Sequence, residues 1–83
     1  MHKLSIDFKE FPTKALLLNF LITRLEEMYS PNYDALIDSL TSYDTPILFE
    51  FKNIKCFENE KDLLEVFDII HKENRLISYI IQE

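Results

Sequence analysis

The sequence predicts a single α/β domain in which three to four helices pack against a three-stranded parallel sheet. Apolar segments of strand length occur near the start, the middle and the end of the 83 residues, and stretches with helical periodicity separate them. Strands separated by helices pair in parallel through right-handed crossovers, which gives this class of fold. Hydrophobic residues make up 47% of the chain, enough for one core, so we expect one domain over residues 1–83.

The N-terminal part of the chain predicts the first strand and the first helix. Residues 3–8 alternate between apolar and polar side chains, which is typical of a strand with one wetter face. Thr13 is a suitable N-cap, and the helix that follows should continue until residues 29–31, where Ser30 and Pro31 interrupt it. Its expected apolar positions are Leu16, Leu17, Phe20, Leu21 and Leu25.

A second, shorter helix follows and leads into the predicted central strand. Asn32 is a good N-cap for this helix, which should end near Ser42. Its expected buried stripe consists of Tyr33, Leu36, Ile37 and Leu40. After a turn at residues 44–46, residues 47–51 form a nearly continuous apolar run, which is typical of a strand covered on both faces.

The C-terminal part predicts a third helix and a last strand. Asn59 is the expected N-cap, with acidic residues in the first turn that suit the helix dipole. The expected buried stripe consists of Leu63, Val66, Phe67 and Ile70. Because the chain contains no glycine, we expect Asn74 to end this helix in the left-handed conformation, before a strand over residues 76–81.

Composition excludes several classes of function. The 15 acidic and nine basic residues give a net charge of −6, so we expect the protein to repel nucleic acid and to suit a basic partner. The absence of glycine excludes the Gly-rich phosphate loops of dinucleotide-binding and P-loop proteins. No stretch approaches the roughly 20 apolar residues of a membrane span, and no signal peptide is visible, so a cytoplasmic location is expected. One Cys and two His offer no cluster for a metal site, and no cofactor is expected.

An enzymatic function is disfavoured because the sequence shows no catalytic constellation. His71 lies in the last turn of the third predicted helix, where a capping role at the surface is the simpler interpretation. Cys56 has no His close in the sequence to act as its base. Paired carboxylates could serve glycoside cleavage, but a domain with three strands offers little cleft to enclose a sugar. We therefore predict no catalytic residue and keep a small hydrolase as a third hypothesis.

The carboxylates of interest are Asp34 and Asp38, which we call the acidic ridge. At positions i and i+4 they share one face of the second helix, with Thr41 a turn further along. At 100° per residue this face lies about 115° from the buried stripe, so it should be open to solvent. The ridge is either an ordinary solvated face or a surface that offers carboxylates to Arg, Lys or His of a partner. Tyr29 and Tyr43 flank it, and tyrosine is enriched at binding surfaces.

The run from Tyr29 to Thr41 resembles the central motif of the barstar family. That motif is an aromatic residue, then Asn-x-Asp-Ala-Leu-x-Asp-x-Leu, then Thr, and it matches the run that contains Asn32, Asp34 and Asp38. An apolar strand after a proline, a helix with Val-Phe and a final Ile-rich strand follow in the same order as in the family. The resemblance covers nearly the whole chain, tightly in the motif and loosely elsewhere.

The resemblance implies a barstar-like fold and a role for each matched position. Asp38 would enter the active site of a ribonuclease, where substrate phosphate normally lies, and Asp34 would pair with basic residues at its rim. The partner-binding residues that the resemblance implies are Tyr29, Asn32, Tyr33, Asp34, Asp38, Thr41, Ser42, Tyr43 and Glu73. The chain departs from the family where Ser30 or Pro31 and Ser42 replace glycines, where Tyr43 replaces the usual Trp, and where Ile69 replaces a contacting Glu.

The sequence therefore predicts a non-enzymatic inhibitor that occludes the active site of a basic ribonuclease. The resemblance implies the immunity or antitoxin half of a bacterial toxin pair, a monomer on its own and a 1:1 heterodimer with the toxin. The alternative is a barstar-like module that uses the same ridge to bind a non-ribonuclease toxin or another basic protein.

Overall fold

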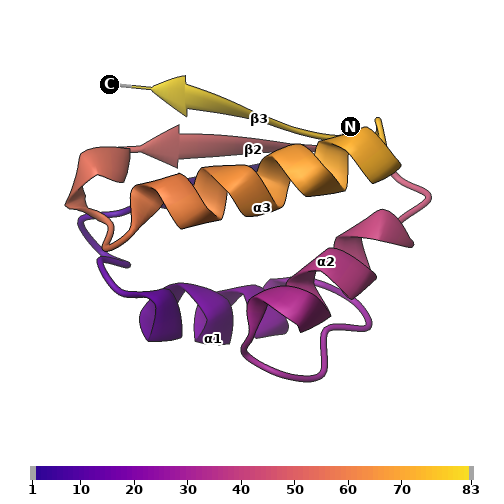
Figure 1. Cartoon of the computed structure of the whole chain (residues 1–83), viewed down its shortest axis with the longest axis horizontal. Helices are drawn as coiled ribbons and strands as arrows, with labels where there is room; N and C mark the ends of the chain where they lie inside the picture. The colour runs from indigo at the N-terminus through magenta and orange to yellow at the C-terminus, as the bar shows by residue number, and fades with distance from the viewer. Residues whose placement is uncertain (1, 83) are drawn as a thin grey trace.

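A computed structural model describes residues 2–82 and confirms the predicted α/β architecture (Figure 1). The chain forms, in order, β1 (His2–Asp7), α1 (Lys14–Arg24), α2 (Tyr33–Thr41), β2 (Ile47–Lys52), the 3-10 helix η1 (Ile54–Cys56), α3 (Glu60–Glu73) and β3 (Ile77–Gln82). All strand pairs are parallel and the sheet order is β1-β2-β3, so β2 is the central strand, as predicted.

The three α-helices lie on one face of the sheet (Figure 1). Because the strand order follows the chain, successive crossovers of one hand place all their helices on the same side. The expectation that β2 is covered on both faces is therefore wrong. The other side, here called the open face, carries Lys3, Ser5, Asp7, Leu48, Glu50, Lys52, Ser78, Ile80 and Gln82.

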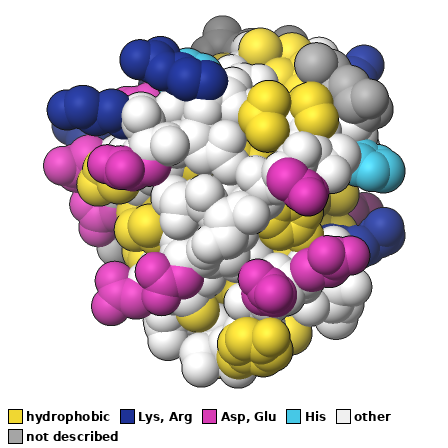
Figure 2. All heavy atoms as spheres, turned by 90° about the vertical axis from the view of Figure 1, so that its right-hand side faces the viewer, with side chains coloured by type: hydrophobic (Ala, Val, Ile, Leu, Met, Phe, Trp, Pro, Cys, Tyr) yellow, Lys and Arg dark blue, Asp and Glu magenta, His cyan; other side chains and the backbone are white. Residues whose placement is uncertain are grey.

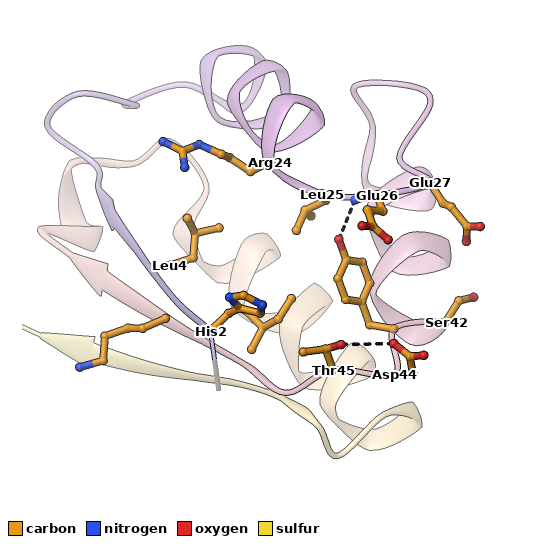
Figure 3. Close-up of a pocket in the computed structure, with 12 residues that line it drawn as sticks. His2, Leu4, Arg24, Leu25, Glu26, Glu27, Ser42, Asp44 and Thr45 are labelled. Carbon is orange, nitrogen blue, oxygen red and sulfur yellow. Dashed lines mark hydrogen bonds between the residues drawn. The ribbon is translucent and has the colours of Figure 1, made fainter.

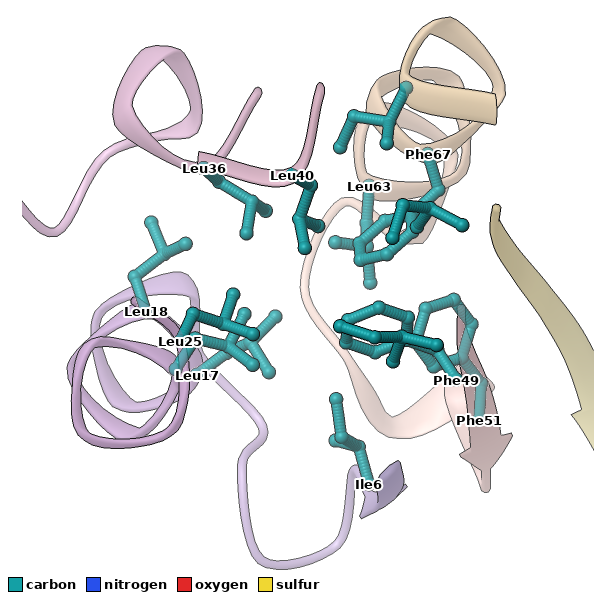
Figure 4. Close-up of a cluster of buried hydrophobic side chains, with 14 of the residues drawn as sticks. Ile6, Leu17, Leu18, Leu25, Leu36, Leu40, Phe49, Phe51, Leu63 and Phe67 are labelled. Atoms are coloured by element: carbon teal, nitrogen blue, oxygen red, sulfur yellow. The ribbon is translucent and has the colours of Figure 1, made fainter. Parts of the chain in front are cut away.

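The core lies between the helices and the covered face of the sheet. Figure 4 shows Phe49 and Phe51 pointing from β2 towards the helices, where they meet Phe67 of α3. The rings of Phe51 and Phe67 are 5.1 Å apart at 86°, and those of Phe49 and Phe67 are 4.9 Å apart at 69°. Such edge-to-face pairs stabilise a core by about 0.5–1.5 kcal/mol beyond the burial of their area. Leu36 and Leu40 place the inner face of α2 in the same core.

Helix α1 begins as predicted but differs in its end and in its buried face. Thr13 caps it, accepting a 3.3 Å hydrogen bond from the main-chain N of Leu16. The helix stops at Arg24 because the chain turns extended at Leu25, so the expectation that it reaches residues 29–31 is wrong. Leu16, expected in the core, is 50% exposed, whereas Leu18 is fully buried. Helical spacing fits either set, and the packing of α1 within the core selects between them.

Two asparagines at the ends of α3 do not act as predicted. Asn59 occupies the N-cap position, but it is left-handed at φ 52° and its side chain makes no capping hydrogen bond. Asn74 is extended at φ −140° rather than left-handed. Its side-chain amide instead donates hydrogen bonds of 2.9 Å to the carbonyls of Leu40 and Tyr43. Asn74 therefore joins the end of α3 to the end of α2.

Glu50 lies at the centre of the open face and joins the three strands. Its carboxylate accepts hydrogen bonds from Ser5 Oγ of β1 at 2.6 Å and from Gln82 Nε2 of β3 at 3.0 Å. Lys3 Nζ lies 3.6 Å from the same group. The hydrogen bond from Ser5, with the nearby lysines, lowers the pKa of Glu50. These polar contacts occupy the middle of a face that no helix covers.

Candidate functional site

Helix α2 carries the acidic ridge, and several contacts fix its position. Asn32 is extended and its side chain accepts a 2.7 Å hydrogen bond from the main-chain N of Ala35, which is the N-cap that the sequence predicts. Ser39 is buried and donates a 2.6 Å hydrogen bond to the carbonyl of Glu26. With Leu36 and Leu40 in the core, the opposite face of α2 is held towards solvent.

Both carboxylates of the ridge are exposed, as the helical wheel predicts. Among residues 2–82, Asp34 and Asp38 have no ion-pair partner. Asp34 lies in the first turn of α2, where the helix dipole favours a negative charge. Asp38 lies in the middle of the helix. Its main-chain carbonyl accepts a 3.0 Å hydrogen bond from Ser42 Oγ, and its side-chain carboxylate has no hydrogen bond among residues 2–82. The ridge therefore offers two free carboxylates on a rigid element.

Asp38 also lines a groove that the sequence does not predict. The groove has a volume of about 420 Å³, and its walls are Glu27, Tyr29, Ala35, Asp38 and Ser42. Tyr29 is 85% exposed, so its ring is available to a partner. The groove brings together three of the predicted binding residues, namely Tyr29, Asp38 and Ser42.

Glu27 is the residue of this site that sequence reasoning missed. It is exposed, and its backbone is left-handed at φ 58°. The other two non-glycine residues with positive φ among residues 2–82 are asparagines, which tolerate this conformation better than glutamate does. In the sequence, Glu27 is marked only as one of two acidic residues shortly before Tyr29. Its position beside α2 depends on the path of residues 25–28.

A second hollow lies beside the groove, between the end of α1 and the segment that joins α2 to β2. Its volume is about 560 Å³, and Glu27 and Ser42 line both this hollow and the groove. Figure 3 shows Arg24 on one side and Glu26 and Asp44 on the other. The charges of this hollow are therefore separated, with its carboxylates on the side next to the ridge.

Tyr43 and Glu73 lie near the end of α2. The hydroxyl of Tyr43 accepts a 2.6 Å hydrogen bond from the main-chain N of Glu26, and the ring is half-buried in the second hollow. Glu73 is exposed and precedes Asn74, whose amide contacts the last turn of α2. Figure 2 views the molecule from this end and shows acidic side chains spread over the face.

Like Ser42 and Tyr43, three further predicted binding residues have their side chains engaged within the chain. Thr41 Oγ1 donates a 2.7 Å hydrogen bond to the carbonyl of Ile37, and Asn32 serves as the cap described above. Tyr33 is half-buried and does not line the groove, and Lys14 Nζ lies 4.3 Å from the centre of its ring. Burial, followed by the carboxylates of Asp62 and Glu58, raises the pKa of Tyr33 to about 12. These side chains support the ridge rather than extend it.

The two nucleophile and base candidates of the sequence lie apart. Cys56 is exposed on η1, before α3 begins, and His71 lies in the last turn of α3. Because α3 has 14 residues and is about 20 Å long, most of its length separates the two side chains. His71 Nδ1 lies 2.7 Å from the carbonyl of Ile77, so its ring contacts β3. Within the described part of the chain, no three side chains of His, Cys, Asp or Glu gather as a metal site, and no helix is long and apolar enough to cross a membrane.

Comparison with known proteins adds no assignment, because no family model matches the chain and no curated protein matches it at a significant level.

Proposed function

We propose that the chain is a barstar-type inhibitor that binds a basic ribonuclease through the acidic ridge and occludes its active site. The observation that carries this proposal is Asp38, an exposed carboxylate on α2 with no ion-pair partner among residues 2–82. It lies within the motif that resembles the barstar family and beside a groove lined by Tyr29. In this proposal the protein acts in the cytoplasm as the immunity partner of a toxin, and binding is its whole mechanism.

The chemistry of the ridge suits a phosphate-binding active site. Such a site gathers Arg, Lys and His to hold a phosphate, and a carboxylate can take the place of the phosphate oxygens. Arg pairs with a carboxylate through two parallel hydrogen bonds, which makes the contact both strong and directional. Asp38 would supply this contact at the centre, with Asp34 one turn earlier on the same face.

The surroundings of the ridge favour a partner that is basic over a larger area. Glu27, Asp44 and Glu73 add exposed carboxylates around α2, and the chain as a whole has a net charge of −6. A surface with one sign of charge raises the association rate of an oppositely charged partner. Tyr29 adds a large exposed ring that would become buried on binding.

Rigidity is the third property that supports the proposal. The cap at Asn32, the Ser39 hydrogen bond to Glu26 and the amide of Asn74 hold both ends and the middle of α2. A side chain on an element held in this way loses little conformational freedom when it binds, so more of the contact energy contributes to affinity.

The experiment that tests this function is capture from an extract of the source organism on immobilised protein, followed by a ribonuclease assay. Wild type should retain a basic protein whose RNA cleavage stops when the chain is added in solution. Asp38→Ala should retain much less of it. Glu65→Ala, which removes the same charge from the outer face of α3, is the matched control and should behave as wild type.

One observation favours a second candidate, a basic partner that is not a ribonuclease. Ile69 replaces the contacting Glu of the barstar family and is 49% exposed on α3. An apolar side chain at that position suits a different partner surface. Retention of a basic protein without ribonuclease activity, lost in Asp38→Ala, would assign the ridge to this second function.

A further inference from the structure

Among residues 2–82, the outer edge of β3 is a hydrogen-bonding surface without a strand partner beyond Ile77, whose N–H donates to the carbonyl of Asn74 at 3.1 Å and whose carbonyl lies 2.7 Å from His71 Nδ1. β3 pairs with β2 on one side only, so alternate N–H and C=O groups along its other side point away from the sheet. Figure 1 shows β3 at the border of the molecule. A regular row of main-chain donors and acceptors is matched by another extended strand, which satisfies all of them at once.

The two edges of the sheet differ in how they resist such pairing. β1 carries Lys3 and Asp7, and charges on an edge strand oppose the addition of another strand. β3, with the sequence ISYIIQ, has no formally charged side chain and no proline, and its register with β2 has no bulge. Ile80 and Ile81 are 42% and 43% exposed at this edge. Only β3 therefore has the character of a strand that accepts a partner.

We propose that a second copy of this chain pairs with β3, antiparallel and edge to edge, about a two-fold axis at Ile80. Residues directly opposite each other in an antiparallel pair lie on the same face of the sheet. This register places Ile80 against Ile80 and Ser78 against Gln82 on the open face, and Tyr79 against Ile81 on the helix side. Apolar side chains meet apolar or aromatic ones and polar side chains meet polar ones, so the strand is its own complement.

Charge and position separate this contact from the acidic ridge. Each copy has a net charge of −6, so two copies repel at long range, but the paired strands themselves carry no formal charge. Added salt should therefore strengthen the pairing of two copies, whereas it should weaken the binding of a basic partner to the ridge. The outer edge of β3 is the border of the sheet that lies away from α2 (Figure 1). The ridge therefore stays open in the proposed dimer.

Sedimentation velocity tests the proposal on the full chain at concentrations from about 5 μM to about 500 μM, the range in which small interfaces associate. Wild type should change from one chain to two as the concentration rises. Ile80→Lys places two lysines against each other and should raise the dissociation constant at least about 100-fold. Ile69→Lys, a comparably exposed change on α3, should leave the dimer intact, and circular dichroism checks that both variants are folded.

Hydrogen exchange of the wild type gives a second measurement that needs no variant. Main-chain amides of β3 that point away from β2 should exchange more slowly at high protein concentration, and those of β1 should not change. Single chains at every concentration, a dimer that Ile80→Lys leaves unchanged, open-ended assembly beyond two chains, or β3 exchange rates independent of concentration would each overturn the proposal. None of these results bears on the ridge, because ribonuclease capture measures a different surface.

Discussion

The side-chain amide of Asn74 donates a 2.9 Å hydrogen bond to the main-chain carbonyl of Leu40, and so joins the end of α3 to the last turn of α2. The same amide also reaches the carbonyl of Tyr43. One side chain therefore bonds to two carbonyls at the end of α2, of which that of Leu40 also accepts a 3.3 Å hydrogen bond from the main-chain N of Tyr43.

We expect Asn74→Ala to destabilise the protein by about 1–3 kcal/mol, because it leaves the carbonyl of Tyr43 without a partner among residues 2–82 and removes one of the hydrogen bonds to the carbonyl of Leu40. Chemical denaturation measures the change. Asn19→Ala is the matched control, because the amide of Asn19 bonds only to the carbonyl of Ala15 on the exposed side of α1, and we expect a much smaller effect there. Equal losses in the two variants would contradict the role assigned to Asn74.

Asp38→Ala should separate binding from folding. Because Asp38 is exposed and its carboxylate has no partner among residues 2–82, we expect unfolding free energy within about 0.5 kcal/mol of wild type. Partner binding should weaken by about 3 kcal/mol or more, since a partner arginine would lose its counter-charge in a buried contact. Calorimetry with the captured partner and thermal unfolding of the free protein measure the two quantities, and a loss of stability with unchanged affinity would oppose the proposed function.

Glu27→Gly should change stability and binding in opposite directions. Glycine adopts the left-handed backbone of this position at little cost, so we expect the free protein to gain about 0.5–1 kcal/mol. Loss of a groove carboxylate should at the same time weaken binding of the basic partner. Glu27→Ala keeps the backbone cost and removes the same charge, so it should weaken binding without the gain in stability; denaturation curves of both variants distinguish the two effects.

Glu50 should make stability depend on pH in the acidic range. Its pKa is lowered in the folded state from the ordinary value of 4.5, chiefly by the hydrogen bond from Ser5. Its contribution is therefore fully present above the unfolded pKa and is lost as pH falls through the folded pKa. The difference in unfolding free energy between wild type and Glu50→Gln should shrink as pH falls below about 4.5. Taking this difference removes the parallel effect of Asp7, whose pKa the Asn53 hydrogen bond also lowers.

Association with the basic partner should slow as salt rises. The exposed carboxylates around α2 attract such a partner over distances comparable with the screening length, which falls from about 10 Å at 0.1 M salt to about 3 Å at 1 M. Stopped-flow measurement of the association rate at increasing sodium chloride checks this expectation. A rate that does not respond to salt would mean that binding uses another surface.

Local pattern was sufficient for much of the fold. The spacing of apolar residues identified α2 and its exposed face, and polar residues at the correct positions identified the caps Thr13 and Asn32. These features depend on interactions within one or two helical turns. Strand segments separated by helices were likewise enough to predict a parallel sheet.

The features that local pattern did not predict depend on contacts between distant residues. Leu16 and Leu18 fit helical spacing equally well, and only the packing of α1 in the core, where Leu18 points towards Leu36 of α2 (Figure 4), decides that Leu18 is buried. Asn74 was expected to stop a helix by its own backbone, but its side chain bonds to residues more than 30 positions earlier. Glu27 joins the groove because residues 25–28 bend back along α2, a path that no local motif marks.

The distance along the chain between the ridge and Asn74 also sets an order in time. Asp38 is added to the growing chain before Asn74, which lies 34 residues after Leu40. A nascent chain that ends inside α3 therefore contains the carboxylates of the ridge but lacks the amide that bonds to the last turn of α2. The ridge can take its final position only after the C-terminal end of α3 has been made.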